Sequence, residues 1–258
     1  MPPKAQLSVV VIAKNEGHCI TESLRSACDW ADELLIIDDC SSDDTAEIAA
    51  RYGRVITEKW DIEGKFRNWA YAQTRNRWVL SLDADEILTD ELKKEISALL
   101  SAPSQDGICA YNIPLRNFIG KYWVRNGGWY PAYKVRLFLK DKFKYEEAEV
   151  HPRVFIDGCC GTLKGEIIHN SYRDIAELTA SMNSQTTLEA KKWLRSGRNM
   201  PLWHAIWRAT DRFFRKYVVK KAYRDGLYGF VIAFYDSLYQ VISYLKYREM
   251  KNNSGSGL

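Results

Sequence analysis

Strand-like and helix-like patterns alternate through the first part of this chain, and this alternation limits the possible folds more than any other feature. Short runs rich in Val, Ile and Leu are typical of strands that a parallel sheet buries on both faces. Such runs occupy residues 7–13, 33–37, 54–58 and 77–82. The segments between them have the apolar spacing of helices, over 20–30, 45–52 and 67–75. This order predicts an α/β fold with a doubly wound, Rossmann-like, mostly parallel sheet flanked by helices.

The pattern changes near residue 110. Residues 111–169 form short aromatic and β-branched stretches broken by Gly and Pro, and we expect them to extend the sheet. From Tyr172 to Met250 the spacing is helical, with breaks at 196–199 and near Gly226. The predicted organisation is an α/β domain over 1–185, divided near residue 110 into two halves, then a helical extension over 186–251 and a flexible end over 252–258.

Composition and charge exclude several classes of protein. Apolar residues make up 46% of the 258 positions, which is enough for a core and rules out a disordered or fibrous chain. The net charge of +4 is too small for a dedicated nucleic-acid binder. The charge is unevenly spread, because residues 191–251 contain 14 Lys and Arg but only 4 Asp and Glu. We therefore expect no nucleic-acid partner, an acidic body and a basic C-terminal segment.

Cysteine usage and the N-terminal residues both favour a cytoplasmic location. The six cysteines show no CxxC spacing and no paired framework, so we expect reduced thiols. The first residues lead straight into a strand-like run, without the basic and apolar layout of a secretory signal peptide.

Two carboxylates follow the fourth predicted strand directly. Asp83 and Asp85 alternate along an extended backbone, so their side chains are expected to point the same way at the carboxyl end of the strand, where ligands bind in such sheets. Carboxylate oxygens are preferred ligands of Mg²⁺ and Mn²⁺, which usually keep substrate phosphates in their shell. A divalent-cation site is therefore predicted. The alternative is that these acids only cap the helix that begins near residue 89.

A series of short motifs lies between residues 7 and 185. The motifs are Val10-Val-Ile-Ala-Lys-Asn-Glu16, Trp30-Ala-Asp-Glu-Leu-Leu-Ile-Ile-Asp38, Ser42-Asp-Asp-Thr45, Trp78-Val-Leu-Ser-Leu-Asp-Ala-Asp-Glu86, Gly127-Gly-Trp-Tyr-Pro131 and His169-Asn-Ser-Tyr172. Together they resemble family 2 glycosyltransferases, and more closely the branch of lipopolysaccharide-core β-1,4-glucosyltransferases. This resemblance implies a GT-A fold, a nucleotide-diphosphate sugar donor, a Mn²⁺ or Mg²⁺ cofactor and inversion at the anomeric carbon. The α/β domain would then be catalytic, with its donor half before residue 110 and its acceptor half after it.

The resemblance also implies roles for individual residues. Asp38 matches the family acid that contacts the base or ribose, and the expected metal ligands are Asp83, Asp85 and His169. The expected donor-binding residues are Ala13, Lys14, Asn15, Glu16, Asp38, Arg67, Asn68, Asp83, Ala84, Asp85 and Trp129. Several of these residues have a purely structural alternative. Residues 14–16 could form an ordinary turn, and residues 67–68 could lie on an exposed helix face. His169 could be a structural histidine, and Trp129 could be a core tryptophan.

An inverting transfer needs a carboxylate that takes the proton from the acceptor hydroxyl. This catalytic base must lie opposite the diphosphate, and the candidates are Glu146, Glu147 and Glu149, with Glu149 preferred. Relatives tend to have His-Glu where this chain has His151-Pro152, and proline cannot exchange a side-chain proton. The identity of the base therefore stays open, and a catalytically degenerate, membrane-bound scaffold is an alternative function.

The basic C-terminal segment has an amphipathic pattern. Between 202 and 219 the aromatic and aliphatic residues fall on one helical face and most arginines on the other. Trp and Tyr favour the bilayer interface, and Lys and Arg are attracted to anionic lipids. Residues 202–247 are therefore predicted to bind an anionic membrane surface. Contact between copies in a homo-oligomer, or packing on the α/β domain, are the alternatives.

These features predict an enzyme that is peripheral on the cytoplasmic, inner face of a membrane. It would transfer a hexose from a nucleotide sugar, most simply a UDP-sugar, to a saccharide acceptor on a lipid carrier or a lipopolysaccharide core. A sugar nucleotidyltransferase is the rival enzyme class, but it usually begins with a Gly-rich phosphate loop, and residues 7–20 contain Gly17 alone.

Overall fold

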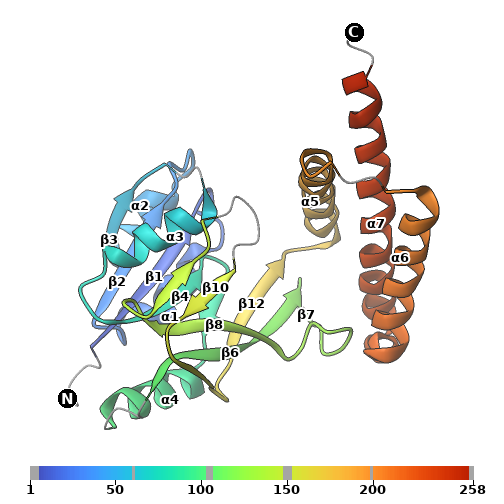
Figure 1. The fold of residues 1–258 in the computed structure, drawn as a ribbon. Helices are drawn as coiled ribbons and strands as arrows, with labels where there is room; N and C mark the ends of the chain where they lie inside the picture. The colour runs from blue at the N-terminus through green and yellow to red at the C-terminus, as the bar shows by residue number, and fades with distance from the viewer. Residues whose placement is uncertain (1–5, 60–61, 103–106, 148–152, 198–199, 256–258) are drawn as a thin grey trace. The chain divides into compact units, whose positions relative to one another are not determined.

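The computed structural model describes residues 6–59, 62–102, 107–147, 153–197 and 200–255. Its first four strands are parallel and lie in the order β3-β2-β1-β4 (Figure 1). They are β1 (Leu7–Ala13), β2 (Glu33–Asp38), β3 (Arg54–Thr57) and β4 (Trp78–Asp83). The helices that connect them are α1 (Ile20–Cys28), α2 (Thr45–Ala49) and α3 (Glu63–Ala72). The four predicted strands are confirmed to within one residue at each end.

The helix predictions are less accurate at their ends. Helices α1 and α2 end before Trp30 and Tyr52, and α3 begins at Glu63 rather than Arg67. The early start of α3 follows from its packing, because Phe66, Ala70 and Tyr71 are buried on one helical face that begins ahead of the predicted segment.

Antiparallel strands extend the sheet beyond β4, as predicted. Strand β8 pairs with β4 and with β6, and the order continues β4-β8-β6-β12-β5. The elements of this part are β5 (Glu86–Leu88), α4 (Asp90–Ser101), β6 (Ile108–Ile119), β7 (Tyr122–Trp123), β8 (Ala132–Leu139), β9 (Phe143–Tyr145), β10 (Val154–Ile156), β11 (Cys159–Thr162) and β12 (Ile167–Tyr172). Strands β9 and β10 form a separate antiparallel pair. This mixed α/β architecture confirms the expected fold class.

Alternate residues of the central strands face two different cores. Val9 and Val11 of β1 pack in a cluster that includes buried residues of α1 and α4. Val10, between them, packs with Phe66 of α3 and Phe138 of β8. The sheet is thus covered on both faces, which is why its central strands contain continuous apolar runs.

The chain divides into two compact units that interrupt each other in sequence. The sheet unit comprises Met1–Leu115 and Ala132–His169, and the helical unit comprises Arg116–Pro131 and Asn170–Leu258. The end of β6 and the short strand β7 therefore group with the C-terminal helices.

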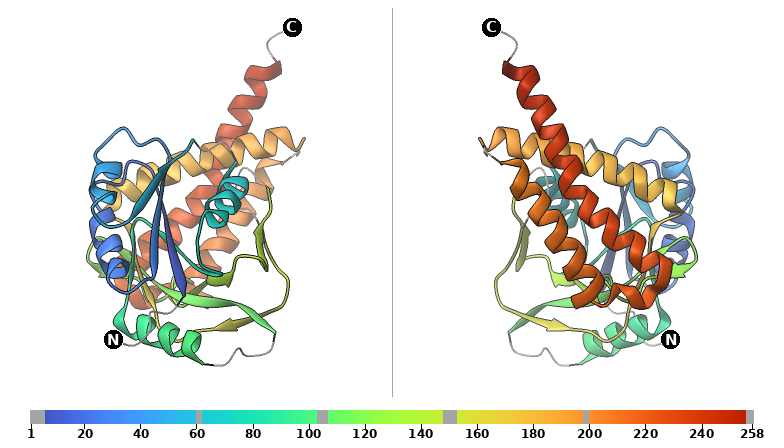
Figure 2. Two further views of the ribbon diagram at one scale, coloured as in Figure 1. Left: turned by 90° about the vertical axis from the view of Figure 1, so that its left-hand side faces the viewer. Right: turned by 90° about the vertical axis from the view of Figure 1, so that its right-hand side faces the viewer.

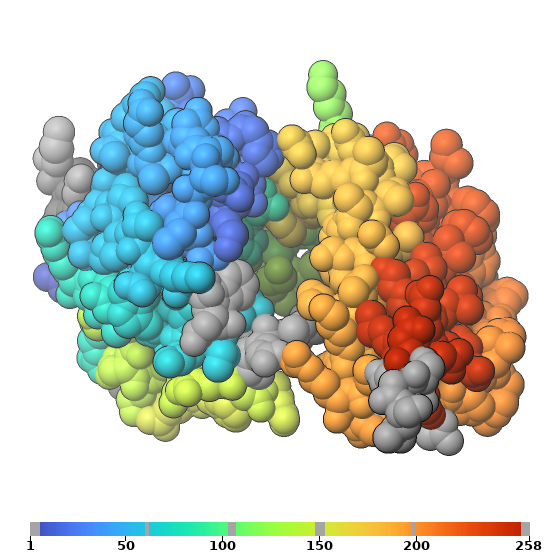
Figure 3. Space-filling model, turned by 90° about the horizontal axis from the view of Figure 1, so that it is seen from above, coloured from blue at the N-terminus to red at the C-terminus, as the bar shows by residue number. Residues whose placement is uncertain are grey.

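The helical unit is built around its last helix. Its elements are α5 (Ile175–Arg195), α6 (Leu202–Phe214), a π-helical turn (Arg215–Val219), a 3₁₀ turn (Ala222–Asp225) and α7 (Gly226–Gly255). Helix α7 packs against both α5 and α6 (Figure 2), and α5 and α7 lie side by side in the space-filling view of Figure 3. The predicted breaks after Arg195 and at Gly226 are confirmed. Within the predicted flexible end, residues 252–255 continue α7, which ends at Gly255.

Two further findings concern the cysteines and the lengths of the helices. All six cysteines are free, as expected for reduced thiols. Among the described residues, no helix combines the length and the apolar character that a membrane span requires.

Candidate functional site

The carboxyl ends of β1, β2 and β4 meet at one edge of the sheet unit. In the parallel register Ala13 is opposite Asp38, and Ile12 is opposite Asp83. Open α/β sheets bind ligands at this edge. The structure therefore brings together three of the sequence-predicted groups: the loop at 14–16, Asp38 and the segment 83–85.

Hydrogen bonds join the loop after β1 to the loop after β2. Asn15 N donates to Ser41 Oγ at 2.9 Å, and Asn15 Oδ1 accepts from Ser42 N at 2.8 Å. Asn15 has a φ of 55°, a left-handed conformation that Asn adopts more readily than most residues. Lys14 Nζ lies 2.7 Å from Asp39 Oδ2. These contacts hold the two loops together beside the carboxyl ends of β1 and β2.

Asp38 is buried at the end of β2, and one of its two carboxylate oxygens accepts no hydrogen bond from the described residues. Its side chain is 2% exposed, and Oδ2 accepts a hydrogen bond from Ser41 N at 3.1 Å. Oδ1 is also buried and has no hydrogen-bond partner among the described residues. A buried carboxylate oxygen without a donor is costly, so this atom is suited to accept a hydrogen bond from a ligand.

A buried network of charges lies at the end of β4. Arg136 of β8 contacts two carboxylates: its Nη2 lies 2.5 Å from Asp83 Oδ2 and also pairs with Glu86 Oε1. Arg67 of α3 approaches the other Asp83 oxygen, with 3.4 Å between Nη2 and Oδ1. Asp83 N in turn donates to Glu86 Oε2 at 3.0 Å. Two guanidinium groups therefore neutralise two carboxylates in the interior of the sheet unit.

The pKa shifts follow from this arrangement. Burial acts to raise the pKa of Asp83, but the positive charges of Arg136 and Arg67 outweigh it and hold that pKa well below its ordinary value. Burial raises the pKa of Glu86 despite its pairing with Arg136. Because both oxygens of Asp83 already face guanidinium groups, Asp83 is less available to a cation than its neighbour Asp85.

Asp85 pairs with His169 across the sheet. Strand β12 runs antiparallel to β5 and places His169 opposite Glu86. His169 Nε2 then lies 3.1 Å from Asp85 Oδ2, and both side chains remain partly exposed. The structure thus brings together two of the three predicted metal ligands, which are 84 residues apart in sequence. Asp83, Asp85 and His169 do not form a tight group of three ligand atoms in the described structure.

A cavity of about 340 Å³ opens beside this network. Its lining includes three cations, Arg67, Lys134 and Arg136, together with Asp83 and Tyr145. The Arg67 guanidinium lies over the Tyr145 ring, 5.7 Å from its centroid. Arg67 Nη1 and Arg136 Nε are buried without hydrogen-bond partners within the described ranges. Donors of this kind, next to an exposed lysine, are suited to oxygens of an anionic group such as a diphosphate.

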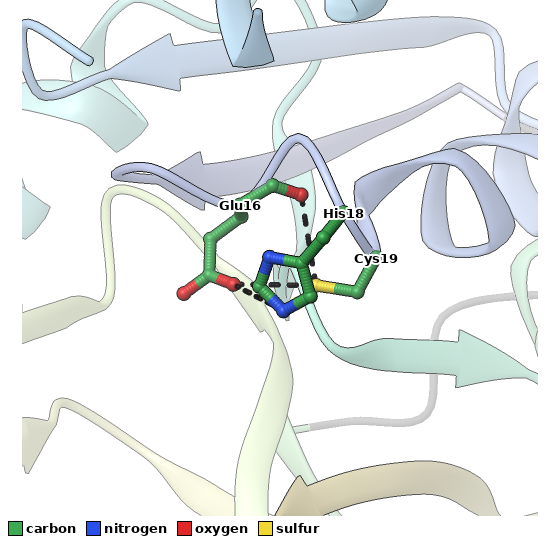
Figure 4. Close-up of side chains that lie close together, drawn as sticks. All are labelled: Glu16, His18 and Cys19. Carbon is green, nitrogen blue, oxygen red and sulfur yellow. Dashed lines mark hydrogen bonds and ion pairs between the residues drawn. The ribbon is translucent and has the colours of Figure 1, made fainter. Parts of the chain in front are cut away.

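The loop after β1 also holds a cluster of potential ligands. Glu16, His18 and Cys19 bring a carboxylate, an imidazole and a thiol within 4.8 Å of one another (Figure 4). Cys19 Sγ lies 3.2 Å from Glu16 Oε2 and 4.0 Å from the carbonyl oxygen of Ala84. The cluster therefore connects the first loop to the segment between the two predicted aspartates.

The two residues of the predicted pair Arg67-Asn68 have different surroundings. Arg67 faces the cavity, whereas Asn68 holds the backbone of β9. Its Nδ2 donates to Tyr145 O at 2.9 Å, and its Oδ1 accepts from Tyr145 N at 2.8 Å. Both ends of the Asn68 amide are thus engaged within the protein.

Two candidate bases, Glu146 and Glu147, directly follow Tyr145, where the chain leaves β9 toward β10. Glu146 Oε2 accepts hydrogen bonds from Arg153 N and Nε, both at 3.2 Å. Glu147 is exposed, with 3.4 Å between its Oε1 and Lys144 Nζ. Glu149, the preferred candidate, lies outside the described residues, as do His151 and Pro152.

Trp129 belongs to the helical unit. Its carbonyl oxygen accepts a hydrogen bond from Asn117 Nδ2 at 2.5 Å, and its ring lies 6.2 Å from that of Tyr172. It lines a small pocket of about 120 Å³ with residues of α5 and α7, including Gln185 and Asp236. The described contacts of Trp129 are all with residues of the helical unit, and its predicted role in binding the sugar donor stays a prediction.

Comparison with known proteins identifies the family. The model described as "Glycosyl transferase family 2" matches residues 8–163. This chain belongs to glycosyl transferase family 2. The lipopolysaccharide core biosynthesis glycosyltransferase LpsC of Rhizobium meliloti is 27% identical over 261 residues, covering 95% of this chain and 93% of LpsC. The uncharacterized glycosyltransferase RT0209 of Rickettsia typhi is 26% identical over 260 residues, covering 96% of this chain and 89% of the relative.

A solved structure is similar over most of the chain. Residues 1–349 of Staphylococcus aureus TarS in complex with UDP-GlcNAc match with a TM-score of 0.47 and 15% identity, covering 97% of this chain and 92% of that one. The family membership makes this protein a transferase and removes the nucleotidyltransferase alternative.

Three members of the site were not predicted from the sequence: Glu86, Lys134 and Arg136. Glu86 follows the predicted aspartates directly and has no separate signal. Arg136 does have one, because it is a charged residue inside the apolar run 135–139 of a strand. A charge that is buried in a strand needs partners of opposite charge, such as the acids that follow β4.

Proposed function

We propose that this glycosyltransferase transfers a hexose from a UDP-sugar, with inversion and with the help of a divalent cation, to a saccharide on a lipid carrier or lipopolysaccharide core. The relative LpsC supports the acceptor class, since its name describes lipopolysaccharide core biosynthesis. The observation that best supports donor binding is that Asp38 and Asp83 end β2 and β4, the two strands that flank β1, and that Asp83 lines a cavity together with Arg67, Lys134 and Arg136.

The donor groups fit this edge by their chemistry. Asp38 Oδ1 would accept a hydrogen bond from the ribose or base, which satisfies its unpaired buried oxygen. Arg67, Lys134 and Arg136 would hold the diphosphate oxygens. The free guanidinium donors of Arg67 and Arg136 are already in place, so little reorganisation is needed when charge develops on the leaving group.

The residues present also fit a divalent cation. Asp85 and His169 offer one carboxylate oxygen and one imidazole nitrogen at 3.1 Å from each other, a donor pair that suits Mn²⁺ and leaves other positions for diphosphate oxygens. A cation held there would neutralise charge on the departing diphosphate. The role of Asp83 in this proposal is to position Arg136 and Arg67 rather than to bind the ion.

Transfer needs a base on the acceptor side. We propose that one of Glu146, Glu147 and Glu149 takes the proton from the acceptor hydroxyl as its oxygen attacks the anomeric carbon and the bond to the diphosphate breaks. Among the two described candidates, Glu147 is more available, because Glu146 is held by Arg153.

The test is a sugar-transfer assay with each glutamate replaced by glutamine. The true base should lose about 10²- to 10⁴-fold in turnover, with the affinity for UDP unchanged. Glu95→Gln is the matched control, because Glu95 accepts from the backbone of residues 164–165 on another part of the sheet unit. Near-normal turnover in all three variants would contradict a glutamate base in this segment.

A further inference from the structure

Helix α6 packs with its small residues inward and its large apolar residues outward. Ala205 and Ala209 are buried, at 1% and 6% exposure. Trp203, Trp207 and Phe214 are instead exposed, at 69%, 59% and 58%. A helix that packs on its neighbours normally shows the reverse arrangement.

The exposed residues form one continuous stripe. Successive residues of an α-helix are rotated by 100° about its axis. On this geometry, the large apolar residues that α6 exposes after its first turn all lie within a face about 120° wide. The same face continues into the π-helical turn. We call this face the outer stripe; it consists of Trp203, Ile206, Trp207, Phe214 and Val218. The apolar surface continues onto α7, because the ring of Phe230 lies 6.0 Å from both Phe213 and Tyr217. Leu227 and Phe234, on the same face of α7, are also exposed.

Positive charge accompanies the outer stripe. Residues 208–224 contain seven Lys and Arg and one acid, Asp211, which pairs with Arg215 at 2.7 Å. Lys220 and Arg224 are exposed in the turns that connect α6 to α7. Trp rings on an apolar face with flanking cations are the composition of helices that lie in the interface of anionic bilayers.

We propose that the outer stripe of α6, with the first turns of α7, inserts into the surface of an anionic membrane with both helices parallel to the bilayer plane. A second copy of the chain fits this surface less well, because it carries the same excess of Lys and Arg over residues 208–224 and offers no matching acids. Anionic headgroups meet the same charge with the opposite sign. The proposal is independent of the donor chemistry described above.

Co-sedimentation of the full-length protein with vesicles tests this directly. The vesicles are phosphatidylcholine alone or phosphatidylcholine with phosphatidylglycerol. We expect binding that requires phosphatidylglycerol and that decreases as salt shortens the screening length from about 10 Å at 0.1 M to about 3 Å at 1 M. The double variant Trp203→Ala, Trp207→Ala should bind about tenfold more weakly or worse. Ile175→Ala with Leu188→Ala, which removes exposed apolar side chains of α5, is the matched control and should bind like the unchanged protein.

A second variant separates charge from insertion. Lys220→Glu with Arg224→Glu should weaken binding to phosphatidylglycerol vesicles while the circular dichroism spectrum and UDP binding stay unchanged. The proposal is overturned if the intact protein stays in the supernatant at low salt, or if the tryptophan variant sediments as strongly as the α5 control. It is equally overturned if the tryptophan variant only converts a dimer to a monomer, without a change in vesicle binding.

Discussion

The two units of this protein place their large apolar side chains in opposite ways. Of the described residues of the sheet unit, only Tyr133 and Phe155 are large, apolar and exposed. Among the residues that the structure describes in the helical unit, fourteen such side chains are exposed, most of them on α6 and α7. The sheet unit shows the converse exception, since Glu86 and Arg136 place charge in its interior.

The two units therefore depart from the usual arrangement in two ways, one by burying charges and the other by exposing apolar side chains. A buried charge lowers stability unless a partner compensates it, and a large exposed apolar surface marks a site of interaction. In the sheet unit the interior charges compensate one another and keep free donor atoms toward a cavity. In the helical unit the apolar surface has no such internal compensation, which is why we infer a membrane for it. The predictions below test this division, from the largest expected effect to the smallest.

The largest effect concerns one phenylalanine from each unit. Phe138→Ala should lower the free energy of unfolding by about 4 kcal/mol, because Phe138 is fully buried and its removal leaves a cavity. Phe214→Ala should change it by no more than about 0.5 kcal/mol, because that side chain is exposed. Urea denaturation followed by circular dichroism measures both. Equal losses would mean that the outer stripe is part of a packed core.

The interior charges give the next effect. Arg136→Met leaves the fully buried carboxylate of Glu86 without its cation and removes one of the two cations at Asp83, so we expect a loss of about 3 kcal/mol in the free energy of unfolding. Arg77→Met is the matched control, because its bidentate pair with Asp141 is exposed to solvent and should contribute little to stability. A loss for Arg136→Met as small as that of the control would show that the network is not a buried one.

A smaller effect depends on pH. Burial acts to raise the pKa of Glu33, but hydrogen bonds from Ser8, the backbone of Arg75 and Arg54 outweigh it and lower this pKa below 4.5. A lowered folded-state pKa gives stability that is complete above the unfolded value and is lost as the pH falls through the folded value. Glu33→Gln should therefore cost about 1–2 kcal/mol at pH 7. The cost should shrink as the pH falls below about 4, measured by urea denaturation across a pH series; a constant cost would contradict the assignment.

The smallest effect should be equal in the two units. Thr89 caps α4 by accepting from Leu92 N at 3.3 Å, and Asp174 caps α5 by accepting from Glu177 N at 2.8 Å. Replacing either cap by alanine should cost about 1 kcal/mol, since capping is a local interaction that does not depend on what the helix faces. Thermal denaturation of the two variants compares them, and a much larger loss for one cap would show that it also carries tertiary contacts.

Much of the sheet unit was predictable from the sequence, because its central strands are buried on both faces of the sheet. Continuous apolar runs identified all four parallel strands, and their alternation with helices gave the fold class. The position of Asp38, Asp83 and Asp85 after these runs then placed them at one edge. Helix ends were less predictable, because α3 owes its start to Phe66 and the packing against β8.

The partners within the site were not predictable from local patterns. Arg136 reaches Asp83 only because β8 pairs antiparallel with β4, and His169 reaches Asp85 only because β12 pairs with β5. Such pairings join segments that are distant in sequence. In the helical unit the amphipathic pattern of α6 was clear, but the sequence did not reveal that its apolar face points outward. That depends on Ala205 and Ala209 taking the packed positions.

The central claim is that Asp85, with His169, holds a divalent cation that the donor diphosphate requires. Isothermal titration of UDP in the presence and absence of Mn²⁺ tests it, on the unchanged protein, on Asp85→Asn and on Asp141→Asn as an exposed aspartate control. We predict that Mn²⁺ raises UDP affinity at least about tenfold in the unchanged protein and in the control, and that Asp85→Asn loses this gain while its fold is unchanged. UDP affinity in Asp85→Asn that Mn²⁺ raises as much as in the unchanged protein would contradict the account.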